Sequence, residues 1–118
     1  MRYKKNLSLA IDFDGSIVDN AYPKIGNMKP YAKQVIHKLR DRGVKIYLWT
    51  PRKGDLLTEA TNFLGKNEVH LDLLSDMDIA KSGNKMVDAY IDYAAYPNKE
   101  EVNWEDVAGY FDIDLDEE

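Results

Sequence analysis

The chain has 118 residues, of which 44% are hydrophobic and 31% charged, with a formal net charge of −5. This composition excludes a disordered chain and predicts a single folded domain over residues 1–118. The negative net charge, with acidic residues concentrated in a tail at 112–118, argues against broad electrostatic binding of nucleic acid. The chain has no cysteine for disulfide or thiolate chemistry and no apolar run near the ~20 residues that cross a bilayer, so we expect a cytoplasmic protein.

The first predicted strand is the apolar run at 7–11, which is followed directly by Asp12-Phe13-Asp14-Gly15-Ser16. A short apolar run of this kind is typical of a buried strand in a parallel sheet, and ligands bind at the carboxyl ends of such strands. Asp12 and Asp14 are two residues apart, so they point the same way while the backbone is extended. Two adjacent carboxylates repel each other, and a fold that keeps them close usually supplies a cation or shares a proton. Gly15 allows a sharp turn that brings backbone N–H groups near an anion.

A polar loop at 19–29 separates this strand from the first predicted helix. Pro30 fits the first turn of that helix, and Gly43 is expected to end it. The second strand is predicted at 44–49, with Thr50 at its carboxyl end. A helix between two strands favours a right-handed parallel crossover, so we expect Thr50 on the same edge of the sheet as the two aspartates.

The remaining elements continue the alternation. A second helix is predicted from its N-cap Asp55 to its closing residue Gly65. A third strand is predicted at 69–74, a fourth strand at 86–92 and a short final helix at 102–111. This order predicts a small α/β sandwich built on a parallel sheet. The fourth strand again ends in an acid, Asp92, so three strand ends carry polar residues suited to a site.

The stretch Asp12-Phe13-Asp14-Gly15-Ser16-Ile17-Val18 resembles the first motif, DxDG[ST], of the haloacid dehalogenase (HAD) superfamily. The segments 22–26, 29–32 and 48–52 resemble a small group of HAD-type hydrolases. The resemblance implies a three-layer α/β/α sandwich with a Rossmann-like parallel sheet. The gaps between the motifs leave no room for a cap domain, so we expect an open site.

The resemblance also implies a Mg²⁺-dependent phosphatase that acts through an aspartyl-phosphate intermediate. Asp12 would be the nucleophile and Asp14 the general acid and base, which are roles that suit two adjacent carboxylates. Mg²⁺ would be bound by Asp12, the backbone carbonyl of Asp14 and Asp92, because magnesium prefers oxygen ligands.

The transferred phosphoryl group needs its own positive or hydrogen-bonding partners. By the same resemblance these are Thr50 and a lysine before the fourth strand, either Lys85 or Lys81, with the backbone near Gly15. Arg52 is a further candidate contact for a substrate anion.

Two alternatives to a phosphatase stay open. Relatives often end the fourth strand with two acids, whereas Tyr93 follows Asp92 here, which suggests a weakly active or inactive module that binds metal and phosphate. A phosphoacceptor receiver domain would need an acid on a middle strand, where this chain has Trp49-Thr50. An open site suits large phosphorylated substrates, including polynucleotide ends, or small ones if a second copy covers it.

Overall fold

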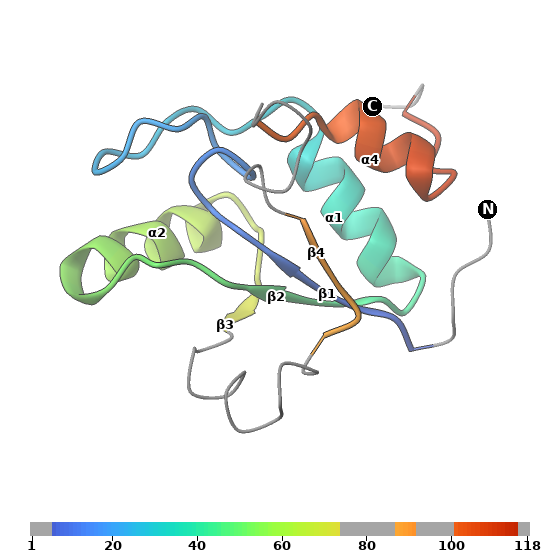
Figure 1. Cartoon of the computed structure of the whole chain (residues 1–118), viewed down its shortest axis with the longest axis horizontal. Coiled ribbons are helices and arrows are strands. Elements are labelled where there is room, and N and C mark those ends of the chain that lie inside the picture. Colours follow the sequence, from blue (N-terminus) through green and yellow to red (C-terminus); the bar gives the residue numbers. More distant parts are fainter. Residues whose placement is uncertain (1–5, 74–86, 92–100, 116–118) are drawn as a thin grey trace.

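A computed structural model describes residues 6–73, 87–91 and 101–115 of the chain (Figure 1). The described elements are, in order, β1 (Ser8–Ile11), α1 (Ala32–Asp41), β2 (Lys45–Leu48), α2 (Gly54–Lys66), β3 (Asp72–Leu73), β4 (Ala89–Ile91) and α4 (Trp104–Tyr110). The described strands form one parallel sheet in the order β3-β2-β1-β4. The predicted α/β class with a parallel, Rossmann-like sheet is therefore confirmed.

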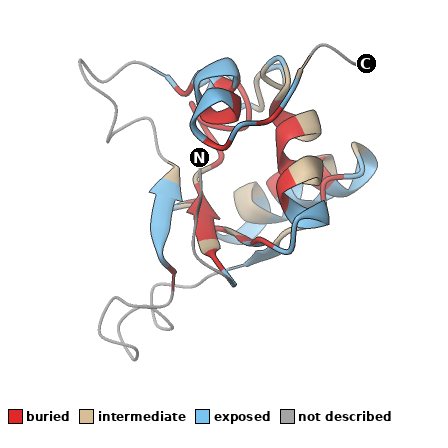
Figure 2. Ribbon diagram, turned by 90° about the vertical axis from the view of Figure 1, so that its right-hand side faces the viewer, coloured by how far each residue is buried: buried red, intermediate tan, exposed pale blue. Residues whose placement is uncertain are grey.

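β1 lies in the middle of the sheet, between β2 and β4. Its last residue, Ile11, pairs in register with Leu48 of β2 and with Ile91 of β4. Figure 2 shows β1 largely buried beside the exposed β4, which agrees with the apolar sequence of the first strand. Because all three strands are parallel, the residues that follow Ile11, Leu48 and Ile91 meet at one edge of the sheet.

The two faces of the sheet have different surroundings. On one face, Leu9 and Ile11 pack in a hydrophobic core to which α1, α2 and α4 all contribute (Figure 2). On the other face, Ala10 packs with Val87, and Tyr47 lies against them. The helices of the described part thus cover one face. The third layer predicted for a three-layer sandwich is not seen among the described residues.

Only the C-terminal end of α1 follows its expected signal. The helix begins at Ala32 after its N-cap Tyr31, so Pro30 precedes α1 and the prediction that it lies in the first turn is wrong. Gly43 adopts a φ of +89° just after α1, which confirms the predicted stop. The second helix continues past Gly65 by one residue, and the left-handed residue that follows it is Glu68, with a φ of +63°. β3 begins at Asp72, later than predicted. No helix in the described ranges is long and apolar enough to cross a membrane.

Candidate functional site

The candidate site lies where the carboxyl ends of β1, β2 and β4 meet. The N–H of Asp12 donates to the carbonyl of Ile91 at 3.1 Å, and the N–H of Trp49 donates to the carbonyl of Ile11 at 3.0 Å. Asp12 and Thr50 therefore share one edge of the sheet, as the sequence predicted. Asp92 is the next residue after Ile91 but lies outside the described residues.

The lysines proposed for phosphate binding, Lys85 and Lys81, also lie outside the described residues, as does Tyr93. The described part of the site is thus formed by the segment after β1 and the segment after β2. It contains Asp12, Asp14, Gly15, Thr50 and Arg52.

The chain turns sharply after Asp12. The N–H groups of Ile17 and Val18 both donate to the carbonyl of Phe13, at 3.0 and 3.2 Å, and Gly15 has a φ of +83°. Gly15 is needed here because an L side chain is disfavoured at this φ. However, its N–H donates to the carbonyl of Val18 at 2.8 Å. The turn itself thus uses this donor, while the expectation that the backbone near Gly15 binds phosphate stays a prediction.

The C-terminal segment anchors the same turn. The N–H of Val102 donates to the carbonyl of Gly15 at 2.9 Å, and the indole Nε1–H of Trp104 donates to the carbonyl of Ser16 at 2.7 Å. Trp104 is 1% exposed, so this bond is shielded from water. The last helix thus holds the turn that carries Asp14, which gives α4 a part in positioning the site.

Asp14 and Arg52 form a buried ion pair. Arg52 Nε donates to Asp14 Oδ2 at 2.7 Å and Arg52 Nη2 donates to Asp14 Oδ1 at 2.8 Å. The Arg52 side chain has no exposed surface, and that of Asp14 is 12% exposed. The hydrogen bonds to Asp14 raise the pKa of Arg52 above its usual value, against the opposing effect of burial. A bidentate pair of this kind fixes the orientation of the carboxylate as well as its charge.

Arg52 also joins two other segments, the loop at 19–29 and α2, to Asp14. Its Nη2 donates to the carbonyl of Lys24 at 3.0 Å and its Nη1 donates to the carbonyl of Leu56 at 3.3 Å. Its Cζ lies 5.1 Å from the ring centroid of Phe13 and 5.2 Å from that of Tyr22. The prediction that Arg52 contacts a substrate anion is therefore wrong, because its side chain is buried and its donors are directed at protein acceptors.

Asp12 and Thr50 are less buried than Arg52. Asp12 is partly exposed, and its Oδ1 accepts a hydrogen bond from the N–H of Phe13 at 2.8 Å. Thr50 is also partly exposed, and its hydroxyl oxygen accepts from the N–H of Arg52 at 3.2 Å. That bond uses a lone pair of the hydroxyl and not its hydrogen, so Thr50 keeps the O–H donor that a phosphoryl oxygen requires.

The donor set at this edge has the chemistry that magnesium prefers. Asp12 supplies a carboxylate and Asp14 a backbone carbonyl, both oxygen ligands of the kind that Mg²⁺ takes together with water. Within the described ranges no group of three or more acidic, histidine or cysteine side chains is arranged to hold a metal. The further ligand predicted from the sequence, Asp92, lies outside the described residues.

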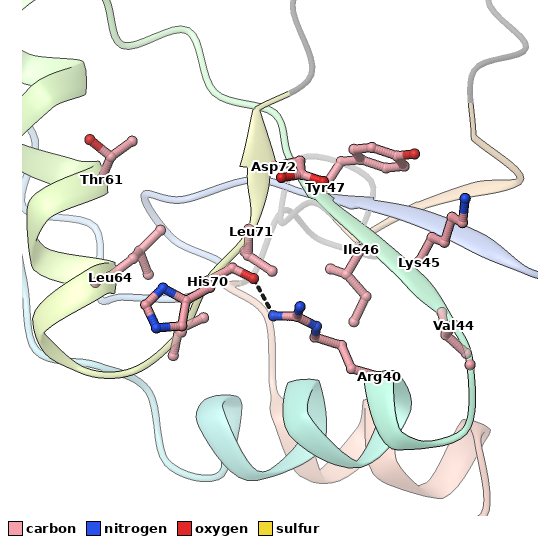
Figure 3. A pocket seen from close by; sticks show the side chains of 13 residues that line it. Arg40, Val44, Lys45, Ile46, Tyr47, Thr61, Leu64, His70, Leu71 and Asp72 are labelled. Atoms are coloured by element: carbon pink, nitrogen blue, oxygen red, sulfur yellow. Dashed lines mark hydrogen bonds between the residues drawn. The ribbon is translucent and has the colours of Figure 1, made fainter.

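A separate hollow of about 510 Å³ lies away from this edge (Figure 3). It is lined by the end of α1, most of β2, part of α2 and the segment that leads into β3, and it includes Arg40 and Lys45. Arg40 donates to the backbone carbonyl of His70, as the dashed line in Figure 3 marks. None of the described residues of the candidate site lines this hollow.

Sequence reasoning missed the partners that position the site. Tyr22 and Lys24 lie in the loop at 19–29, whose sequence gave no indication that it contacts Arg52. Arg52 was considered for its charge but not as a partner of Asp14. Trp104 was expected in a final helix, yet no local pattern linked its indole to Ser16. These contacts join residues far apart in the chain, so periodicity and spacing carry no signal for them.

The comparisons with known proteins add support for the fold. No family model and no curated protein matches the chain. A solved structure described as a conserved protein coded by a locus from Bacteroides thetaiotaomicron is similar, with a TM-score of 0.76 and 26% sequence identity. The match covers 92% of this chain and 91% of that one, which supports the α/β fold of the described part.

Proposed function

We propose that this protein is a Mg²⁺-dependent phosphatase of the HAD type that hydrolyses phosphomonoesters through an aspartyl-phosphate. The observation that supports this most is the position of Asp12 and Asp14. Both follow the central strand, at the edge where the ends of β2 and β4 meet beside them. Such an edge is where open α/β sheets bind their ligands.

Asp12 is the proposed nucleophile. One of its carboxylate oxygens attacks the phosphorus, a P–O bond to Asp12 forms, and the P–O bond to the substrate alcohol breaks. The departing oxygen takes a proton from Asp14. A water molecule then attacks the same phosphorus, gives a proton to Asp14, and releases phosphate with Asp12 restored.

Arg52 holds Asp14 in position for these proton transfers. Each carboxylate oxygen of Asp14 accepts one hydrogen bond from the guanidinium, which leaves each oxygen a second lone pair for a proton. We therefore assign Arg52 as a positioning residue. It orients Asp14 and does not touch the substrate.

The phosphoryl group would be bound by the hydroxyl of Thr50 and by Lys85 or Lys81. Mg²⁺ would be held by Asp12, the carbonyl of Asp14 and Asp92. When bound, the metal supplies positive charge that stabilises the phosphoryl oxygens as charge moves during transfer.

The test is phosphate release from p-nitrophenyl phosphate with and without Mg²⁺. We expect turnover by the wild type with Mg²⁺ and a loss of at least about 100-fold in Asp12→Asn, because an amide is a far weaker nucleophile than a carboxylate. Asp41→Asn, which changes an exposed acid at the end of α1, is the matched control and should retain full activity. Equal rates for wild type and Asp12→Asn would remove Asp12 as the nucleophile.

A second candidate function is a module that binds metal and phosphate without turnover. The ion pair favours it, because a proton on Asp14 must be accommodated beside two guanidinium donors. This alternative predicts Mg²⁺-dependent binding of orthophosphate without phosphate release from any ester. Turnover that Asp14→Asn abolishes would exclude it.

A further inference from the structure

Tyr22 is an exposed aromatic side chain held close to the proposed catalytic carboxylates. Tyr22 is 54% exposed, yet its ring centroid lies 5.2 Å from Cζ of Arg52. Arg52 in turn makes the bidentate pair with Asp14. A single guanidinium therefore separates the Tyr22 ring from the Asp14 carboxylate.

The backbone around Tyr22 is fixed at several points. The N–H of Lys24 donates to the carbonyl of Ala21 at 2.9 Å, which closes a turn around residues 22 and 23. The carbonyl of Lys24 accepts from Arg52 at 3.0 Å, which ties that turn to the site. Further back, the N–H of Asp19 donates to the carbonyl of Asn27 at 2.8 Å. The ring is thus presented by an ordered loop and not by a free one.

The base of the same loop is held by a charged cluster. Lys29 Nζ lies 3.1 Å from Asp19 Oδ1 and 2.8 Å from Glu101 Oε1. Burial alone would lower the pKa of Lys29, but its hydrogen bonds to Glu101 and Asp19 outweigh that effect and raise the pKa above its usual value. The loop is therefore anchored at its base by these ions and at its turn by Arg52.

Shielding of the Arg52–Asp14 ion pair accounts for only part of the surface of the Tyr22 side chain. Arg52 is 1% exposed, so cover is complete, while more than half of Tyr22 still faces solvent. An aromatic ring that is already ordered loses little conformational entropy when a ligand packs against it. Flat groups such as nucleic acid bases stack well on such rings.

We propose that Tyr22 determines specificity by stacking against an aromatic ring in the leaving group of the substrate. This inference rests on the proposed phosphatase site and names its substrate class, a phosphomonoester whose alcohol carries a planar ring. Stacking of one base on an aromatic side chain is worth enough to raise affinity about tenfold or more.

The experiment compares AMP with ribose 5-phosphate, which both carry phosphate on the primary 5-hydroxyl of ribose and differ in whether the leaving alcohol bears a planar base. Affinity is measured by calorimetry without Mg²⁺, and kcat/KM with Mg²⁺, for the full-length wild type, Tyr22→Leu and Tyr22→Phe. Tyr110→Leu is the matched control, because Tyr110 is 61% exposed but lies on α4. Phenyl phosphate and cyclohexyl phosphate form a second pair, which tests a ring attached directly to the ester oxygen.

In at least one pair, we expect the aromatic member to be preferred about tenfold in affinity or in kcat/KM. Tyr22→Leu should lose this preference, and Tyr22→Phe and Tyr110→Leu should keep it. Equal affinity for both members of each pair, or a preference unchanged in Tyr22→Leu, would overturn the role of Tyr22 even if Mg²⁺-dependent turnover is found. A Tyr22-dependent preference in binding without turnover would support Tyr22 and contradict the phosphatase. Absence of both binding and turnover would overturn both proposals.

Discussion

Replacing Arg52 with methionine should destabilise the fold strongly, because it leaves a buried carboxylate without its partner. Arg52 has no exposed side-chain surface and Asp14 only 12%, so water can reach little of the unpaired charge. Removing one partner of a buried pair typically costs about 3–5 kcal/mol. Against a usual total of about 5–15 kcal/mol, this is a large share of the free energy of unfolding.

The assay is urea unfolding followed by circular dichroism for wild type, Arg52→Met, Asp14→Leu and the double variant. Apolar residues in place of both charges often restore much of the lost stability, so the double variant should be more stable than the sum of the two losses predicts. Arg40→Met, which changes an exposed arginine bonded to a backbone carbonyl, is the control and should change stability by less than about 1 kcal/mol.

The result that would refute this reasoning is a loss below about 1 kcal/mol for Arg52→Met, or strict additivity in the double variant. Either outcome would mean that the pair is solvated in solution. In that case Arg52 would again be a candidate for contact with the substrate, as the sequence first suggested.

Three further predictions concern the segments that hold the site. Lys29→Met should lower the free energy of unfolding by about 0.5–1 kcal/mol at pH 7. Because the pKa of Lys29 is raised on folding, this difference from wild type should be present below about pH 10.4 and should disappear at higher pH, as measured by urea unfolding at a series of pH values. Trp104→Phe should cost about 1–3 kcal/mol in the same assay, because the carbonyl of Ser16 loses its buried donor; a change within 0.5 kcal/mol would contradict the role given to that bond. Gly26→Ala should lower the melting temperature, because its Cβ would lie 2.2 Å from a backbone carbonyl oxygen. Gly109→Ala, in a helix and with open space around it, should instead raise the free energy of unfolding by about 0.5–1 kcal/mol. Equal effects of the two substitutions would show that the loop around Gly26 adapts freely.

Features that depend on neighbours in the chain were predictable. The apolar run before Asp12 predicted a buried strand, and the strand–helix–strand order placed Thr50 at the same edge, because parallel crossovers leave few other arrangements. Gly43 was recognised as a helix stop from its position after the apolar pattern of α1. The sharp turn at Gly15 was also expected, since glycine alone tolerates a φ of +83° without strain.

What the sequence by itself determined is the order of the elements and the clustering of acids at the ends of strands, since hydrophobic periodicity and turn residues act over short distances. Only the tertiary structure decided that Arg52 is the buried partner of Asp14, 38 residues away, and that the indole of Trp104 holds Ser16, 88 residues away. It also decided that the N–H of Gly15 serves its own turn. The physical reason is that a buried charge or hydrogen-bonding group must find a partner wherever packing brings one, and that choice depends on the three-dimensional arrangement of the whole core.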